Sequence, residues 1–209
     1  MELIKLTVEE FGAITASNAP APGGGSVSAL AGSLAAALSQ MVANLTVGRK
    51  KYAEVQSDME EALPRLAEAQ KELLAAVDAD SKAFDLYMAA LPMPKNTPEE
   101  QAARKEAMQN GLKAAVAVPL SVAQRVEGLL PTLEKVLALG NSNAVTDGLV
   151  SVMMARTGIL GAIYNVRVNL ASIEDEEFVR EHEAICAEIQ KNAVAWELRV
   201  LGQYPLTGM

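Results

Sequence analysis

The fold is decided by residues 26–47, SVSALAGSLAAALSQMVANLTV, which contain no charged side chain. The large apolar residues of this stretch recur at the spacing of an α-helix: Leu30, Leu34, Leu38, Met41 and Leu45. Gly48 follows directly and is typical of a helix C-terminus. The stretch therefore predicts a buried helix at the centre of the fold.

Capping signals predict further helices on both sides of this one. Capping boxes at Thr7–Glu10 and Thr97–Glu100 each begin a helix. The expected helices cover 7–17, 58–91, 98 into the 120s, 132–139, 142–170 and 172–202. Pro64 either kinks or starts the second of these, and Pro119 is expected to kink the third.

The whole chain, residues 1–209, is expected to form one all-α domain, a bundle of long and partly kinked helices. Hydrophobic residues make up 50% of the chain but aromatic residues only 4%, so the apolar mass comes from Ala, Leu, Val and Met, which favour helices. No stretch alternates apolar and polar residues between Gly or Pro brackets, as a strand would. The abundance of Ala, Gly and Ser permits close helix packing, and we expect self-association.

Charge and composition exclude several classes of protein. A net charge of −8 leaves no general basic face for nucleic acid. The uncharged run at 26–47 raises the alternative of a membrane span, but its many polar residues argue against one. The single cysteine, Cys186, and an N-terminus without a signal peptide's apolar run indicate a reducing, cytoplasmic location. His182 is the only histidine and lies among charged residues, so neither a Ser/His triad nor a histidine-based metal site is expected.

Asp80 is the acidic residue that helical phase places among apolar neighbours. On the helix over 58–91 it shares a face with Val77 and Phe84, whereas Asp78 and Lys82 project to the opposite side. Burial would raise the pKa of the Asp80 carboxyl, as proton transfer at neutral pH requires. The alternative is a structural carboxylate that caps a backbone or pairs with an arginine.

A second polar face is expected on the helix over 142–170. Asn143, Asp147 and Asn165 project to one side of it, together with Gly158 and Gly161. A carboxylate flanked by amides suits a ring that has its own hydrogen-bond donors and acceptors. For the glycines alone, close helix packing is favoured over a ligand.

A third polar group begins at the triple glycine before the central helix. Gly23, Gly24 and Gly25 precede Ser26 at a helix N-terminus, where exposed N–H groups and the helix dipole favour an anion. The spacing matches no nucleotide-binding motif, and a plain flexible turn is the alternative. Asn44 continues a polar stripe along the same helix, which buried hydrogen bonds could satisfy without a ligand.

Cations that could receive a carboxylate-bearing substrate lie in two places. Lys50 and Lys51 follow the central helix beside Arg49, and Lys95 lies in the break after the helix over 58–91. Each could equally be a solvated surface charge.

Taken together, these segments resemble the cyclodeaminase/cyclohydrolase family of folate enzymes, the C-terminal half of formiminotransferase-cyclodeaminase and its stand-alone bacterial relatives. The matching blocks are PAPGGGSVSALAG at 20–32, MVANLTVGRKKY at 41–52, GNSNAVTD at 140–147 and NVRVNL at 165–170. Asp80 with Ala83-Phe84, Pro94-Lys95 and Val118-Pro-Leu120 add shorter matches. The resemblance covers most of the chain.

The resemblance implies an all-helical homodimer that acts on a one-carbon unit at N5 of tetrahydrofolate, with no metal and no further cofactor. In the cyclodeaminase reaction, N10 attacks the formimino carbon and ammonia leaves, which gives 5,10-methenyltetrahydrofolate. In the cyclohydrolase reaction, water adds to that methenyl carbon. We expect the cyclodeaminase, with the cyclohydrolase as the alternative and a non-catalytic helical scaffold as the alternative of another class.

The roles of the candidate residues follow from the resemblance and the helical projections together. Asp80 is expected to be the general acid/base, and Asp147 with Asn143 to hold the pterin or the amidine nitrogens. The Gly23–Ser26 turn is expected to wrap the substrate, and Lys50, Lys51 or Lys95 to receive its glutamate carboxylates. Asn44 and Asn165 complete the expected binding residues.

Overall fold

The computed structural model describes residues 2–205, and all regular secondary structure among them is helical. Its α-helices are α1 (Val8–Thr15), α2 (Gly24–Asn44), α3 (Gln56–Ala90), α4 (Pro98–Glu127), α5 (Leu130–Leu139), α6 (Val145–Leu170) and α7 (Glu176–Leu201). There are three short 3₁₀ helices: η1 (Leu3–Lys5) precedes α1, η2 (Lys50–Val55) lies between α2 and α3, and η3 (Ser142–Ala144) lies between α5 and α6. The expected all-α, single-domain architecture is confirmed.

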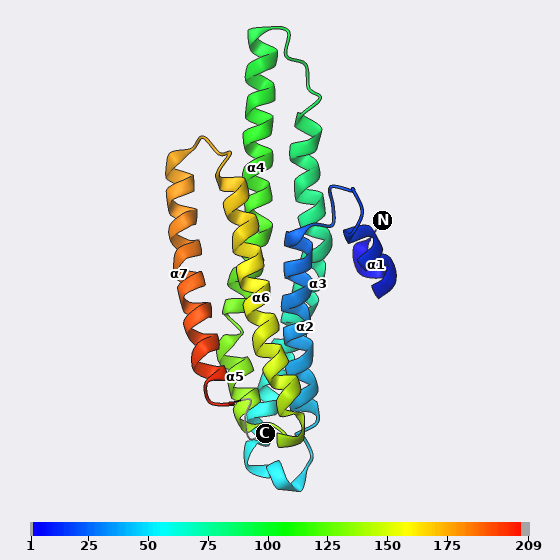
Figure 1. Ribbon diagram of the computed structural model, residues 1–209, viewed down its shortest axis with the longest axis vertical. Helices are drawn as coiled ribbons and strands as arrows, with labels where there is room; N and C mark the ends of the chain where they lie inside the picture. The colour runs from blue at the N-terminus through cyan, green and yellow to red at the C-terminus, as the bar shows by residue number, and fades with distance from the viewer. Residues whose placement is uncertain (1, 206–209) are drawn as a thin grey trace.

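The long helices form one elongated bundle (Figure 1). The prediction of a buried helix over 26–47 holds only for the alanine and serine side of α2, because Leu34 and Met41 of the predicted apolar row are 44% and 45% exposed. α2 packs against α3 on one side and α6 on the other, while α4 covers α3 and α6. α7 packs on the outer side of α6, and the α3–α4 hairpin rises above the other helices (Figure 1). Both predicted capping boxes are present, at Thr7–Glu10 and Thr97–Glu100. Pro64 and Pro119 lie inside α3 and α4, so Pro64 does not start its helix.

Close approach of α2 and α6 depends on glycine. A Cβ at Gly158 would lie 3.0 Å from the Gly32 nitrogen and 3.1 Å from the Ser28 carbonyl oxygen. A Cβ at Gly161 would overlap the Ser28 hydroxyl. Helix packing therefore explains both glycines without a ligand, which was one of the two interpretations from sequence.

Buried serines join the same two helices through hydrogen bonds. The Ser151 hydroxyl donates to the Ala35 carbonyl oxygen at 2.8 Å and lies 2.9 Å from the Ser39 hydroxyl. Both serine side chains are buried. Each buried polar group in this seam has a partner, as a stable interior requires.

One sequence expectation about α3 is wrong. Asp78, assigned to the solvent side, is buried, and its Oδ1 accepts a hydrogen bond of 2.5 Å from the Leu3 backbone N–H. The reason is tertiary, because η1 folds back over that side of α3 and covers it. Asp80, expected to be the buried carboxylate of the pair, is only half-buried.

One side of the bundle, which we call the α2–α6 face, carries exposed apolar side chains along its whole length. Its members are Val27, Leu34 and Met41 on α2, and Val150, Met153, Tyr164 and Val168 on α6. Helical phase places both rows on the same side of the bundle, away from the seam between the helices. Tyr164 and Val168 are 63% and 65% exposed. An apolar strip of this extent on a folded domain marks an interaction surface.

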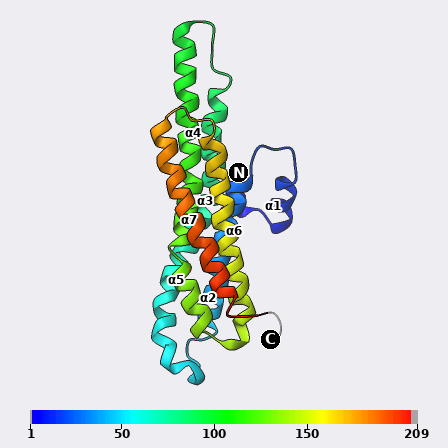
Figure 2. The same cartoon turned by 60° about the vertical axis from the view of Figure 1, so that its left-hand side comes forward.

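The N-terminal helix stands apart from the bundle. α1 has no buried residue, and Figure 2 shows it projecting to one side on a long connection to α2. Val8 is 93% exposed. Since so short a helix gains little from propensity alone, α1 depends on its capping box and on Phe11, which is partly buried against the core.

Two segments, Gly24–Asn44 and Ser142–Leu170, are long and apolar enough to cross a membrane by length and composition. Half or more of each apolar window is buried inside the bundle. Core helices of a globular domain pass the same test, so this is weak evidence for a membrane span.

The glycine contact between α2 and α6 yields a stability prediction. Replacing Gly158 by Ala forces a methyl group against the α2 backbone, which cannot rotate away, and should lower the free energy of unfolding by about 1–3 kcal/mol. Chemical denaturation followed by circular dichroism measures this change. Gly12→Ala is the matched control, because a Cβ there meets nothing within 4 Å. An unchanged midpoint for Gly158→Ala would contradict the packing argument.

Candidate functional site

The first turn of α2 lies directly against Asp80 of α3. A Cβ at Gly25 would overlap the Asp80 carboxylate, so only glycine permits this contact. The Ser26 hydroxyl lies 2.8 Å from the Val77 carbonyl oxygen and 3.2 Å from Asp80 Oδ2, and shares its proton between these two acceptors. Asp80 is thereby held at the N-terminus of α2.

Asn165 closes the site from α6. Its amide nitrogen donates to the Gly161 carbonyl oxygen at 2.8 Å, which fixes the side chain beside Gly24. A Cβ at Gly24 would lie 2.8 Å from that same nitrogen. The glycine turn, Asp80 and Asn165 thus come from three different helices and meet at one place.

These residues surround a cavity of about 150 Å³, which we call the glycine-turn cavity. Its wall consists of Pro20, Ala21, Gly23, Gly24, Gly25, Asp80, Ser81, Phe84, Ala115, Asn165, Val168 and Asn169. One acid, two amides, a hydroxyl and a glycine-rich turn therefore converge on an otherwise apolar pocket. Such a mixture is typical of a small-molecule site.

Burial raises the pKa of the Asp80 carboxyl above its ordinary value, and the hydrogen bond from Ser26 opposes the rise only in part. Asp80 makes no ion pair with any lysine or arginine among residues 2–205. A carboxyl of this kind takes up and releases a proton closer to neutral pH than a surface aspartate does. Geometry and electrostatics together favour proton transfer over a purely structural role.

A second cluster lies at the opposite end of the bundle. The Tyr52 hydroxyl accepts a hydrogen bond from the Ser142 backbone N–H at 3.0 Å, and lies 3.3 Å from Asn141 Oδ1, to which it donates. Lys51 Nζ lies 5.1 Å from the centre of the Tyr52 ring and 3.4 Å from the Ser142 hydroxyl. Hydrogen bonds from Ser142 lower the pKa of Tyr52 to about 8. We call residues 49–52 with Ser142 the basic cluster.

Buried contacts hold the basic cluster in place. Asn141 is buried, its backbone N–H donates to the Thr46 hydroxyl at 2.8 Å, and its amide donates to the Leu45 carbonyl oxygen at 3.0 Å. These bonds tie the end of α2 to the start of α6. The side chains of Lys50 and Lys51 are therefore presented from a fixed segment.

The structure separates the predicted site residues into these two groups. Gly23, Gly24, Gly25, Ser26, Asp80 and Asn165 meet at the glycine-turn cavity, whereas Asn44, Lys50, Lys51, Asn143 and Asp147 lie at the other end. The rise of a helix puts Asp147 roughly 27 Å from Asn165 along α6. Lys95 belongs to neither group, because it lies exposed in the turn between α3 and α4. Within one protomer the predicted residues therefore do not form a single site.

Two residues of the basic cluster were missed by sequence reasoning as site candidates. Tyr52 and Ser142 both lie within the blocks that carry the family resemblance, at 41–52 and 140–147. Their contact joins segments far apart in the chain, so no local sequence pattern predicts it. The available signal was their position in the sequence, because Tyr52 directly follows the predicted Lys51 and Ser142 directly precedes the predicted Asn143.

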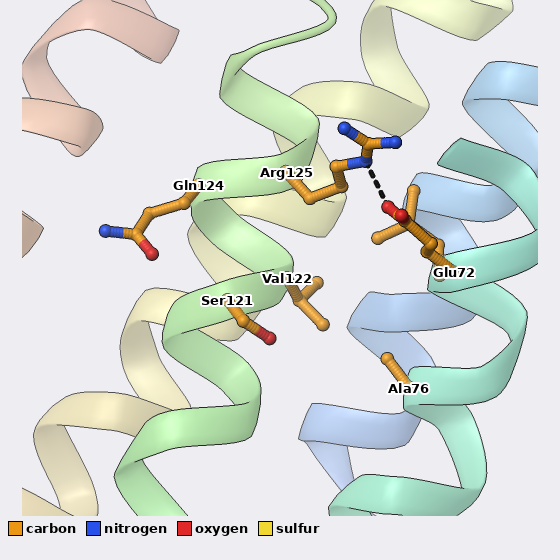
Figure 3. Close-up of a pocket in the computed structure, with 7 residues that line it drawn as sticks. Glu72, Ala76, Ser121, Val122, Gln124 and Arg125 are labelled. Atoms are coloured by element: carbon orange, nitrogen blue, oxygen red, sulfur yellow. Dashed lines mark ion pairs between the residues drawn. The ribbon is translucent and has the colours of Figure 1, made fainter. Parts of the chain in front are cut away.

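A larger cavity, about 490 Å³, lies elsewhere, between α3 and α4. Figure 3 shows Arg125 of α4 paired directly with Glu72 of α3 in its wall, with the Nε and Oε2 atoms 2.5 Å apart. Its floor is apolar and includes Ala76 and Val122. Because its two charged groups neutralise each other, the cavity offers no free acid or base for chemistry, and it is not the candidate site.

Within residues 2–205, no three His, Cys, Asp or Glu side chains gather closely enough to hold a metal ion. Cys186 is buried, and burial raises the pKa of its thiol, which is the environment of an inert packing residue.

A family model and individual relatives both place this chain in the same protein family. Residues 7–188 match the model of the formiminotransferase-cyclodeaminase family. The methenyltetrahydrofolate cyclohydrolase of Methylorubrum extorquens is 40% identical over 186 residues, which cover 87% of this chain and 89% of that protein. The formimidoyltransferase-cyclodeaminase of Gallus gallus is 42% identical over 173 residues, 83% of this chain but 32% of that protein. The chain thus spans about a third of the length of that longer relative.

A solved structure shares the architecture. The crystal structure of formiminotetrahydrofolate cyclodeaminase from Thermotoga maritima superposes with a TM-score of 0.84 at 31% identity, covering 96% of each chain. The similarity in backbone architecture therefore extends over the whole bundle.

The raised pKa of Asp80 predicts a pH-dependent stability difference. Ionising Asp80 costs more in the folded chain than in the unfolded one, so the wild type loses stability as pH rises from below about 3.9 through the folded pKa. Asp80→Asn, which stays neutral, should therefore gain stability relative to the wild type between pH 4 and pH 7.5. Urea denaturation of both proteins at the two pH values tests this, and a difference that stays constant or reverses would argue against a desolvated carboxyl.

Proposed function

This chain belongs to the formiminotransferase-cyclodeaminase family, and on that premise we propose that it is a folate enzyme acting on a one-carbon unit at N5 of tetrahydrofolate. The resemblance expected from the sequence is confirmed. The observation that carries the proposal is Asp80, a half-buried carboxyl of raised pKa in a cavity shared with the glycine turn and Asn165.

We favour the 5-formiminotetrahydrofolate cyclodeaminase reaction. N10 attacks the formimino carbon, N10 loses its proton, and the departing nitrogen gains the protons with which it leaves as ammonia. A single group that accepts one proton and delivers another serves both steps, provided that its pKa lies near the working pH. Asp80 has the position and the environment for this role.

The surrounding residues support binding of a flat heterocycle. Gly24 and Gly25 let a ligand approach the start of α2, where free N–H groups and the helix dipole attract electron-rich atoms. Asn165 and Asn169 offer amide groups from α6 on the facing wall. Phe84 and Val168 supply the apolar area against which a ring packs. We propose that the reaction uses these groups without a metal or an additional cofactor.

The second candidate is the 5,10-methenyltetrahydrofolate cyclohydrolase reaction. It is favoured by the Methylorubrum extorquens relative of that name, which is similar to this chain over 89% of its own length. Here water adds to the methenyl carbon, and the same carboxyl would accept its proton. Both reactions pass through a tetrahedral carbon between nitrogens, so one site suits either.

We also propose that the protein is a homodimer that associates through the α2–α6 face. The face is apolar along the bundle, and its two helices are rich in small residues that allow a close partner. Symmetric association would remove Leu34, Met153 and Tyr164 from water.

A paired spectrophotometric assay tests the proposed function. The cyclodeaminase produces methenyl absorbance from 5-formiminotetrahydrofolate with release of ammonia, whereas the cyclohydrolase removes that absorbance when methenyltetrahydrofolate is supplied. Asp80→Asn should lower turnover by about two orders of magnitude or more while folate binding stays measurable. Full activity of Asp80→Asn would make Asp80 a structural residue, and a folded wild type that binds no folate would favour the scaffold.

Gly25→Ala tests the geometry of the acid. The added methyl group overlaps the Asp80 carboxylate and must displace it, so turnover should fall by about a hundredfold, the cost of misplacing a catalytic group by an ångström. Circular dichroism should show an intact helical fold. Gly12→Ala, in the exposed helix α1, is the matched control and should keep wild-type turnover. Equal turnover of the two variants would contradict a catalytic role for the Asp80 carboxyl.

A further inference from the structure

We propose that the homodimer is antiparallel and that each active site is composite, with the glycine-turn cavity of one protomer completed by the basic cluster of its partner. This inference rests on the proposed function and on the α2–α6 face as the dimer contact. It assigns to the partner subunit's Lys51 and Tyr52 a place beside a substrate that Asp80 serves.

The starting point is the distance between the two clusters. In one protomer the basic cluster lies at the lower end of α2 and α6, roughly 30 Å from the glycine turn by the rise of α2. The cavity at Asp80 holds about 150 Å³, and no lysine or arginine is part of its wall. The wall of this cavity therefore offers no cation to the carboxylates of an anionic ligand bound in it.

The apolar face joins the two clusters. Val168 belongs both to the wall of the glycine-turn cavity and to the α2–α6 face, so the cavity opens at one end of that face. Met41 and Val150 mark its other end, next to the basic cluster. Leu34 lies midway along α2. A twofold axis near Leu34, perpendicular to the helices, places the upper end of one protomer against the lower end of the other.

Charge favours this orientation over the parallel one. Lys50, Lys51 and Arg49 form no ion pair with any residue in the 2–205 range, and neither does Asp80. An antiparallel arrangement sets each basic cluster against the end of the partner that carries the glycine-turn cavity, whose wall has a carboxyl and no cation. A parallel arrangement would set the two basic clusters side by side, and like charges at an interface oppose association.

The composite site supplies what each half lacks. The glycine turn, Asp80 and Asn165 would hold the ring and move the proton, and the partner subunit's Lys50 and Lys51 would receive the carboxylates at the other end of the same molecule. The Tyr52 hydroxyl, already hydrogen-bonded to Ser142 and Asn141, would be a positioned donor next to those lysines. The two groups of residues that the sequence assigned to one site then meet in one site.

Subunit complementation tests this arrangement. One variant is Asp80→Asn and the other is Lys50→Met with Lys51→Met, and each homodimer should lose most of its activity. Mixing them at equal amounts under conditions of subunit exchange should restore about a quarter of wild-type activity, because half of the dimers are mixed and each has one intact site. A site contained in one protomer would give no recovery, since every protomer carries one defect.

The outcomes separate this inference from the proposed function. If Asp80→Asn alone keeps full turnover, the proposed function fails whatever the mixture does. If both homodimers are inactive and the mixture also stays inactive, the proposed function stands and the composite site is overturned. Full activity of the lysine variant, or a monomer by analytical ultracentrifugation, would overturn the composite site as well.

Thiol crosslinking gives a readout that needs no activity. Val27→Cys and Met41→Cys lie on the same row of α2, on either side of Leu34. In an antiparallel dimer a short bismaleimide should join Val27→Cys of one protomer to Met41→Cys of the other, and should not join two copies of Val27→Cys. Crosslinking of Val27→Cys to itself would indicate the parallel dimer. The wild type is the control, because its only cysteine, Cys186, is buried.

Discussion

The structure depends on how closely the backbone of α2 approaches its neighbours. Gly158 brings the α6 backbone against α2 at Ser28 and Gly32, and Gly25 brings the first turn of α2 against α3 at Asp80. A methyl group at Gly158 would press on the α2 backbone, and one at Gly25 would displace the acid. Small side chains in this bundle therefore do two things at once. They let the core close, and they leave the start of α2 open beside a carboxyl.

The position of Asp80 illustrates how a folded chain prepares a proton carrier. Burial of the carboxyl opposes its ionisation, the Ser26 hydroxyl supports it, and no lysine or arginine of residues 2–205 pairs with it. The resulting carboxyl lies in a cavity lined by amides and apolar side chains from three helices. Such a group costs stability at neutral pH, which is a reason to connect it with function rather than with the fold.

The two polar clusters and the apolar face form one pattern. The clusters lie at opposite ends of α2 and α6, and the exposed row between them has the width of two helices and nearly their full length. A contiguous exposed apolar face of this size is rare on a monomer and marks an interaction surface. A second copy in reverse orientation would cover it and would bring a set of lysines to the outer end of each glycine-turn cavity, so that the same contact accounts for the face and for the separation of the clusters.

The sequence by itself determined the helices and the direction in which each side chain points from its axis. Capping boxes at Thr7 and Thr97, the uncharged run at 26–47 and the polar stripes on α3 and α6 were all readable, because these signals act between residues a few positions apart. Only the tertiary structure decided which polar groups share a site. Helical phase specifies the direction of a side chain but not its height along a bundle, so Asp147 and Asn165 share a face while lying at opposite ends. The burial of Asp78 under η1 and the contact of Tyr52 with Ser142 had the same origin, since they join segments that meet only when the chain has folded.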